Sequence, residues 1–222
     1  MNFSWAECYP EVHKICTLFT LTELSAPHRY SYKPLAAFLQ DGPQCGLVAL
    51  AIYSGNPSTA SVQSLLETAK NEGFTNNGEM FSVQNMATLA RLSLKSTSVQ
   101  VYSGLLNTKE IKEFLLNGAH LLVPYDTDKD NSPGLLNGSR AHWAIICGAV
   151  ETESDFYVIA RHGKAINVAI WKLSDLSESN AQLNEVGTYQ KQPNIDFKLP
   201  QGGIQGDLGL KCKSIILKEN IL

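Results

Sequence analysis

The sequence predicts an α+β domain in which helices of the first half pack against an antiparallel sheet formed by the second half. Two observations carry this prediction. Apolar residues recur at helical spacing between residues 45 and 115, whereas short runs rich in β-branched and aromatic residues follow one another after Gly118. Helices and strands that are segregated along a chain are typical of the α+β class. With 222 residues, the chain fits one such domain.

An apolar stretch over 45–53 predicts a buried helix, and the Ser/Gly/Asn/Pro segment 54–57 ends it. Ser58 and Ser82 are typical N-cap residues, and each precedes apolar residues at the i, i+3, i+4, i+7 spacing of one buried helix face. A further short helix is expected around 111–115. The first half of the chain is therefore expected to supply helices.

Runs of residues that suit a pleated sheet follow this helical part. The expected strands are 120–125, 141–148, 156–160, 168–171 and 214–217. The polar segment 126–140 starts like a calcium loop, but Asn131 stands where such a loop has glycine and Asn137 where it has a bidentate glutamate. We therefore expect a hydrated loop rather than a calcium site.

Residues 1–35 mix aromatic, charged and proline residues without clear periodicity. We expect them to form an N-terminal arm packed on the domain or a partly ordered leader, and we expect the domain itself to span 36–222. Hydrophobic residues at 44% and charged residues at 18% are typical of a soluble globular protein. The formal net charge of -3 gives no general attraction to nucleic acid or to an anionic membrane, so neither is expected as a partner.

The cysteines argue against a disulfide framework and against a structural zinc site, because their number is odd, their spacing is wide and none forms a Cys-x-x-Cys pair. They are Cys8, Cys16, Cys45, Cys147 and Cys212. No run approaches the ~18 apolar residues of a membrane span, and charges interrupt the apolar residues of the N-terminus. We therefore expect a cytoplasmic protein that needs no metal or organic cofactor.

The clearest indication of chemistry is the segment Gln-Asp-Gly-Pro-Gln-Cys-Gly over 40–46. A Gly-Pro turn leads into the apolar helix and places Cys45 in its first turn, while Gly46 leaves the surroundings of the sulfur open. A helix N-terminus carries about half a positive charge and unpaired N–H groups, and both stabilise the nucleophilic thiolate. Cys45 is therefore a candidate nucleophile, and the preceding glutamines are candidate oxyanion donors beside its backbone N–H. The alternative is that Cys45 is a small buried hydrophobe, as most free cysteines are.

His142 is the candidate general base, because it begins a hydrophobic strand directly after the polar loop. At this position the imidazole would lie at the rim of a cleft and would be supported by a rigid sheet. The alternative is a strand-end histidine that is hydrogen-bonded to its neighbours. Several residues that follow His142 are candidates for the group that orients it, namely Asp155, His162 and Asn167, and a backbone carbonyl or a water can serve instead.

Two of these segments together resemble the actin maturation proteases, which belong near the bacteriocin-processing peptidases of the papain-like clan. The resemblance rests on Leu-Gln-Asp-Gly-Pro-Gln-Cys-Gly-Leu-Val-Ala-Leu over 39–50 and on Ala-His-Trp-Ala over 141–144. Tyr-Val-Ile-Ala-Arg-His-Gly-Lys over 157–164 is similar to the strand that follows in the family. The resemblance covers roughly residues 35 to 217.

This resemblance implies a papain-like fold and an activity, the removal of the acetylated N-terminal residue of immature actin. It implies Cys45 as the nucleophile, His142 as the base and Gln40 as the oxyanion donor. Gln40 lies five positions before the cysteine, whereas related papain-like enzymes tend to have six. Family members are also described with a proline-rich N-terminal extension that engages profilin. The arm over 1–35 has only three prolines, so profilin contact has little support in this chain.

Positive charges cluster in sequence around the proposed cleft, at Arg140, Arg161 and Lys164. They can attract an acidic peptide such as the N-terminus of actin, although each one is also an ordinary surface charge. Arg140, Arg161 and His162 are therefore expected to bind substrate or to orient the base.

Two other functions stay open. One is a papain-like peptidase or transferase that acts on another peptide. The other is a non-catalytic binding module of the same fold. A Cys45 pKa that stays at about 8.5 would favour this second function.

Overall fold

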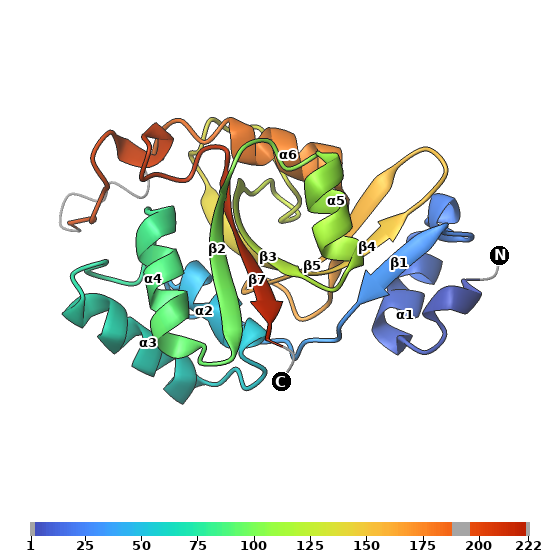
Figure 1. Ribbon diagram of the computed structural model, residues 1–222, viewed down its shortest axis with the longest axis horizontal. Helices are drawn as coiled ribbons and strands as arrows, with labels where there is room; N and C mark the ends of the chain where they lie inside the picture. The colour runs from blue at the N-terminus through green and yellow to red at the C-terminus, as the bar shows by residue number, and fades with distance from the viewer. Residues whose placement is uncertain (1–2, 188–195, 221–222) are drawn as a thin grey trace.

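The computed structural model describes residues 3–187 and 196–220. Its centre is an antiparallel sheet of seven strands in the order β2-β7-β3-β4-β5-β6, with β1 paired to β4 off this path (Figure 1). The strands are β1 Arg29–Tyr32, β2 Thr97–Ser103, β3 His120–Asp126, β4 Ala141–Glu151, β5 Phe156–His162, β6 Ala169–Lys172 and β7 Lys213–Glu219. In these two ranges the α-helices are α1 Pro10–Leu18, α2 Cys45–Tyr53, α3 Thr59–Asn71, α4 Val83–Ser93, α5 Lys109–Leu116 and α6 Leu173–Ala181. The predicted α+β class is confirmed.

Helices cover both faces of the sheet (Figure 1). Helix α2 packs on β4 and β5, α4 packs on β2, and α5 and α6 lie against the opposite face. Alternate side chains of β4 point to the two faces, so Trp143 and Ile145 join the core around α2 whereas Ala144 and Ile146 join the second core beneath α5 and α6. The start of α2 and the start of β4 thereby come together at one edge of the first core.

The predicted helices and strands match the structure closely. Helix α2 has the predicted limits, Ser58 caps α3 by accepting a hydrogen bond from the Ser61 backbone N–H, and Ser82 caps α4 in the same way through Asn85. Each of the five predicted strands is present, and its ends lie no more than three residues from the predicted ones. The sequence analysis did not identify α1, β1, β2 or α6.

The described part of the N-terminal arm is built into the sheet. Strand β1 pairs antiparallel with β4, and the approach is so close that a Cβ on Gly148 would lie 2.8 Å from the carbonyl oxygen of Ser31. Glu11 of α1 forms an ion pair with the buried Arg161 of β5 and accepts a hydrogen bond of 2.7 Å from the backbone N–H of Val168. The arm is therefore held by main-chain pairing and by a shielded ion pair.

Asp126, the last residue of β3, fixes the loop that precedes β4. Its side chain is fully buried. The carboxylate accepts hydrogen bonds of 2.7–3.0 Å from three backbone N–H groups of the loop, those of Leu136, Gly138 and Arg140, and from the side-chain amide of Gln182. A buried carboxylate costs free energy unless such donors satisfy its oxygens. Asp126 therefore sets the path along which the chain enters β4.

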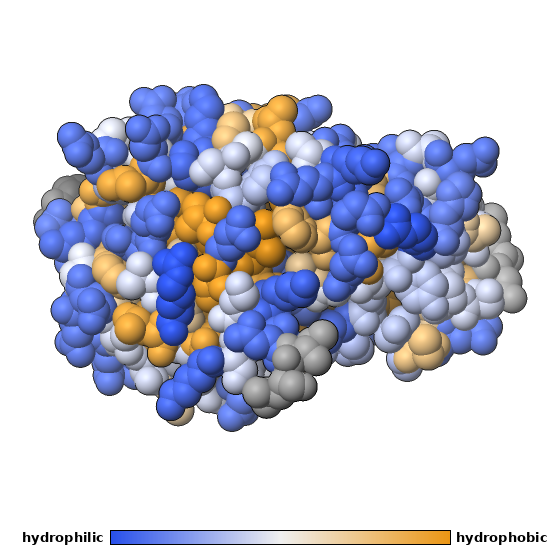
Figure 2. Space-filling view, in the orientation of Figure 1, coloured by the Kyte–Doolittle hydropathy of each residue, from blue (hydrophilic) through white to orange (hydrophobic). Residues whose placement is uncertain are grey.

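One sheet edge is formed by β2, and its surroundings are apolar at the surface. Figure 2 shows an apolar patch over the β2 region beside α5. Leu92 and Leu105, which flank β2 in the sequence, are both more than half exposed. Over the described ranges, no helix has the length and apolar character that a membrane crossing requires.

Candidate active site

Cys45 is the first residue of α2, and the positive end of this helix is left free for its sulfur. The N-cap residue, Gln44, makes no side-chain capping bond, and the first turn contains no acidic residue. The first hydrogen bond within the helix runs from Val48 N to Gln44 O at 2.9 Å, so the preceding N–H groups have no helical partner. Gly46 does not open the sulfur to substrate as expected. It makes room for Trp143, because a Cβ there would lie 3.2 Å from the indole Cδ1.

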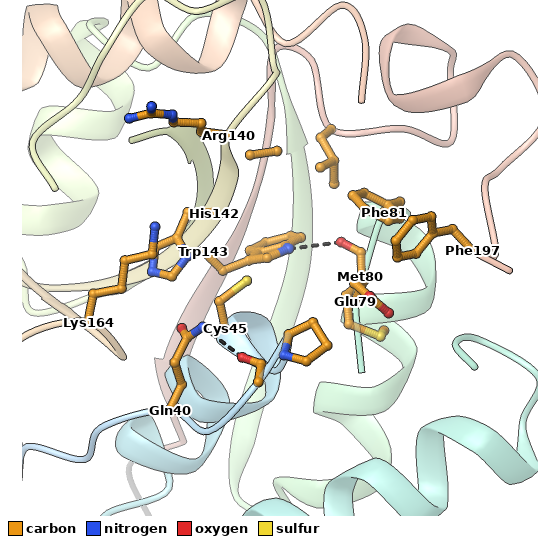
Figure 3. A pocket seen from close by; sticks show the side chains of 14 residues that line it. Gln40, Cys45, Glu79, Met80, Phe81, Arg140, His142, Trp143, Lys164 and Phe197 are labelled. Carbon is orange, nitrogen blue, oxygen red and sulfur yellow. Dashed lines mark hydrogen bonds between the residues drawn. The ribbon is translucent and has the colours of Figure 1, made fainter. Parts of the chain in front are cut away.

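His142 is the second residue of β4 and is almost completely buried, with 3% of its surface exposed. Its Nε2 is buried and has no hydrogen-bond partner among the residues that the structure describes. The nitrogen that remains available for proton exchange is therefore Nδ1. Figure 3 shows the side chains of Cys45 and His142 converging on one pocket, with Gln40 beside them.

This pocket has a volume of about 360 Å³, with Arg140 and Lys164 on one side and an apolar wall, beside which Glu79 lies, on the other (Figure 3). The apolar wall consists of Pro43, Met80, Phe81, Trp143, Phe197 and Leu210, and the charged residues are Glu79, Arg140 and Lys164. The wall is tied together by a hydrogen bond of 2.9 Å from Trp143 Nε1 to Met80 O (Figure 3) and by the perpendicular rings of Phe81 and Phe197, 5.8 Å apart. Such a cavity accepts an uncharged group next to a polar chain.

Gln40 lines the pocket and is held against the end of β5. Its backbone N–H donates to Gly163 O at 2.8 Å, and its Nε2 donates to Gly42 O at 2.9 Å. Residue 163 has to be glycine, because a Cβ there would lie 2.9 Å from both Cβ and Oε1 of Gln40. The other candidate glutamine, Gln44, has its Cγ against Gly78 and does not line the pocket. Of the two, Gln40 is the one placed beside the sulfur.

Burial shifts the pKa values of Cys45 and His142 in the directions that favour their neutral forms. Burial raises the pKa of the Cys45 thiol, and the backbone of Trp143 and the charge of Lys164 offset this only in part. Burial also lowers the pKa of His142 well below 6.5, and the charge of Lys164 lowers it further. The helix N-terminus was expected to lower the pKa of Cys45, whereas burial of the sulfur acts in the opposite direction and raises it.

Comparison with known proteins places this site in a family. The family model described as actin maturation protease-like, C-terminal domain, matches residues 35–150, which include Gln40, Cys45 and His142. The actin maturation protease of Drosophila melanogaster is 43% identical over 216 residues, which cover 96% of this chain and 80% of that protein. The chain belongs to the actin maturation protease family. The proteins of the same name from Danio rerio and Xenopus tropicalis are 31% and 30% identical, over 83% and 82% of this chain and 72% and 70% of their own lengths.

In this member of the family, the predicted cationic residues separate into two groups. Arg140 and Lys164 line the pocket, and Lys164 Nζ donates to Thr127 Oγ1 at 3.2 Å. Arg161 does not line the pocket, because its guanidinium forms the ion pair with Glu11 of α1. Arg161 pairs with Ile145 and faces the core around α2, whereas its neighbour His162 pairs with Ala144 and faces the second core.

The candidates for the orienting group also separate. Asp155 pairs with Lys172 at 2.9 Å at the other end of β5, and Asn167 is exposed. His162 is the one that lies beside His142, with ring centroids 5.8 Å apart and planes at 80°. Of the three candidates for the orienting group, the structure therefore places only His162 beside His142, and Asp155 and Asn167 lie elsewhere.

Sequence analysis missed the apolar wall and the buried Asp126. The position of Trp143 could have been predicted, because it follows His142 on a strand and its side chain must therefore point to the opposite face of the sheet from that of His142. Phe81 precedes the N-cap Ser82, a position at which a hydrophobic residue often packs back on its helix. No local signal marks Phe197 or Leu210, which come from the long connection to β7.

Proposed function

We propose that this chain is a cysteine peptidase that removes the acetylated N-terminal residue of actin, on a papain-like domain. The observation that carries the proposal is the shared pocket of Cys45, at the uncapped start of a buried helix, and His142, at the start of a central strand. The name of its relatives supports actin as the substrate. The five free cysteines suit a reducing compartment, and we place the activity in the cytoplasm.

The two sides of the pocket match the two parts of such a substrate. Acetylation removes the positive charge of an N-terminus, so an acetylated first residue fits the apolar wall around Trp143 and Phe197. Arg140 and Lys164 supply positive charge for the acidic residues that follow. Burial raises the pKa of Glu79, the one carboxyl in the described pocket lining, which favours its neutral form and reduces repulsion of an acidic peptide.

The reaction begins with two neutral groups. As Cys45 Sγ attacks the carbonyl carbon of the first residue, its proton passes to Nδ1 of His142. The C–N bond then breaks and His142 gives the proton to the leaving amine, which becomes the new N-terminus of actin. The acetylated residue remains as a thioester on Cys45 until water, deprotonated by His142, hydrolyses it.

Gln40 and the start of α2 stabilise the negative oxygen that forms in both steps. The Cys45 backbone N–H lies ahead of the first helical hydrogen bond and is free to donate. The side-chain amide of Gln40 has two N–H groups, of which one donates to Gly42 O, so the second is available for the oxyanion. No metal is assigned a role in these steps.

A non-catalytic binding module is the second candidate, and two observations favour it. The pKa of Cys45 is raised rather than lowered, and His142 Nε2 lacks an acceptor among the described residues. A pocket that only binds needs neither a reactive thiol nor an oriented base. Measurement of peptide cleavage separates the two candidates directly.

The test uses three synthetic peptides and mass spectrometry. The first carries an acetylated actin N-terminus, the second has the same sequence with a free amine, and the third is acetylated but has lysines in place of the acidic residues. We expect loss of the acetylated residue from the first peptide only, because the apolar wall disfavours a free ammonium and Arg140 and Lys164 repel lysines. Equal cleavage of all three peptides would favour a general peptidase, and cleavage of none would favour the binding module.

The pH dependence of cleavage tests the role of His142. A general base acts in its neutral form, and the pKa of His142 lies below 6.5. The acid limb of kcat/KM is therefore expected below pH 6.5, and Lys164→Gln should move it to higher pH because the charge of Lys164 lowers that pKa. Lys129→Gln, at an exposed loop position, is the matched control and should leave the limb in place. An acid limb above pH 6.5 in the native protein would contradict this assignment.

A further inference from the structure

We infer that His162 is a positioning residue, which holds His142 in its working orientation by ring packing in the place where related Cys–His peptidases use a side-chain carboxylate or amide. This inference rests on the proposed function, since it concerns the same base. It begins with the fact that His142 Nε2 is buried and has no acceptor in the described chain. The usual partner of this nitrogen fixes the orientation of the ring, so another interaction has to do so here.

Four rings, one from each of four neighbouring strands, form a continuous aromatic cluster around His142. They are Tyr125 of β3, His142 of β4, His162 of β5 and Trp171 of β6. Tyr125 and His162 each lie with their centroids 5.8 Å from the His142 ring, at interplanar angles of 76° and 80°. Their perpendicular contacts restrict rotation of the imidazole about its χ2 angle from two directions.

His162 is itself held firmly enough to position a neighbour. Its ring stacks on Trp171 at 5.9 Å and 19°, and Trp171 in turn packs on Tyr125 at 5.0 Å. The backbone N–H of Lys164 donates to His162 Nδ1 at 3.3 Å. Burial lowers the pKa of His162 to about 4, so at neutral pH the ring is uncharged, accepts at Nδ1 and carries its proton on Nε2. The tautomer and the plane of His162 are therefore both fixed.

The nearest buried carboxylate does not take this role. Asp126 lies one residue beyond Tyr125, but its two oxygens already accept hydrogen bonds from three backbone N–H groups and from Gln182. The positive charge that His142 gains during the reaction consequently meets no adjacent carboxylate in the described structure. Packing by His162 supplies the orientation, whereas the electrostatic support of a triad is absent from the described surroundings of the ring.

The experiment compares His162→Ala, His162→Phe and the control His120→Phe in the full chain. His120 is also buried, but it packs on Tyr53 at the far end of β3. We measure kcat and KM on the acetylated peptide and, separately, the rate of Cys45 alkylation by iodoacetamide between pH 5 and 8. The alkylation needs no actin sequence, so it tests His162 even if the proposed substrate is wrong. Thermal unfolding establishes that each variant is folded.

We expect His162→Ala to lower kcat by about tenfold to a hundredfold with little change in KM, because a displaced base loses efficiency steeply. The base-assisted part of the alkylation rate should fall with it. His162→Phe should restore most of both rates, since it restores a planar ring, and His120→Phe should change neither. A folded His162→Ala protein with native rates would overturn the inference. So would a His162→Phe protein as impaired as the alanine variant, because the nitrogens of His162 would then be needed.

Discussion

Replacement of Cys45 by alanine is expected to abolish release of the acetylated residue, with a loss of at least about 10³-fold in kcat. The thioester cannot form without the sulfur, and no other cysteine lines the described pocket. The fold should persist, because Cys45 is only partly buried and alanine suits the first turn of a helix; we expect the free energy of unfolding to change by less than about 1 kcal/mol. Intact-mass time courses on the peptide and urea unfolding measure the two quantities.

The matched control for this experiment is Cys8→Ala, which removes an exposed thiol outside the pocket. It should leave cleavage unchanged. Trapping of the acylated intermediate on the native protein, and its absence from the Cys45 variant, would place the bond on the predicted sulfur. Cleavage at a native rate by Cys45→Ala would show that the mechanism is wrong, whatever the substrate.

The second large effect is expected for Asp126→Ala, as a loss of about 3–5 kcal/mol in the free energy of unfolding. The substitution removes the acceptor of four donors, and the backbone N–H groups of Leu136, Gly138 and Arg140 cannot all turn to water. The loop before β4 then loses its anchor, so Arg140 and the start of β4 lose their fixed positions. Urea unfolding measures the stability, and peptide cleavage is expected to fall as well.

Asp128→Ala provides the comparison, because Asp128 lies two residues further along the same loop and is exposed. Its carboxylate accepts a hydrogen bond only from the backbone N–H of Lys129 among the described residues. Its stability change should remain within about 0.5 kcal/mol. If Asp126→Ala were as mild as this control, the carboxylate would not be the anchor that its hydrogen bonds indicate.

The elements that the sequence predicted are those whose signals are local. The apolar run of α2 and the serine caps of α3 and α4 depend on neighbours within one or two turns. Strand β1 was missed because it has four residues and its pairing partner lies more than 100 positions away in β4. Helix α6 was missed because its sequence, Leu-Ser-Asp-Leu-Ser-Glu-Ser-Asn-Ala, is mostly polar and has only two large apolar residues. In both cases tertiary contacts outweigh local propensity.

The residues of the candidate site likewise fall into those that local sequence predicts and those that it does not. Cys45, His142 and Gln40 stand in distinctive local contexts, and the structure places all three at one pocket. The grouping of Arg161 with them rested on closeness in sequence, which cannot show that its guanidinium pairs with Glu11, a residue 150 positions away in α1. The raised pKa of Cys45 depends on how many atoms surround the sulfur, and no sequence pattern reports that number.

The ion pair between Glu11 and Arg161 affects whether the N-terminal arm can be removed without a loss of stability. The family model begins to match at residue 35, yet a chain started there would lose Glu11, the ion-pair partner of the Arg161 guanidinium. It would also strip Val12 and Cys16 from the core and free one side of the β4 backbone where β1 now pairs. The arm therefore contributes an ion pair, apolar core side chains and a paired strand to the stability of the domain. We therefore expect a chain that starts at residue 35 to be less stable than the full chain.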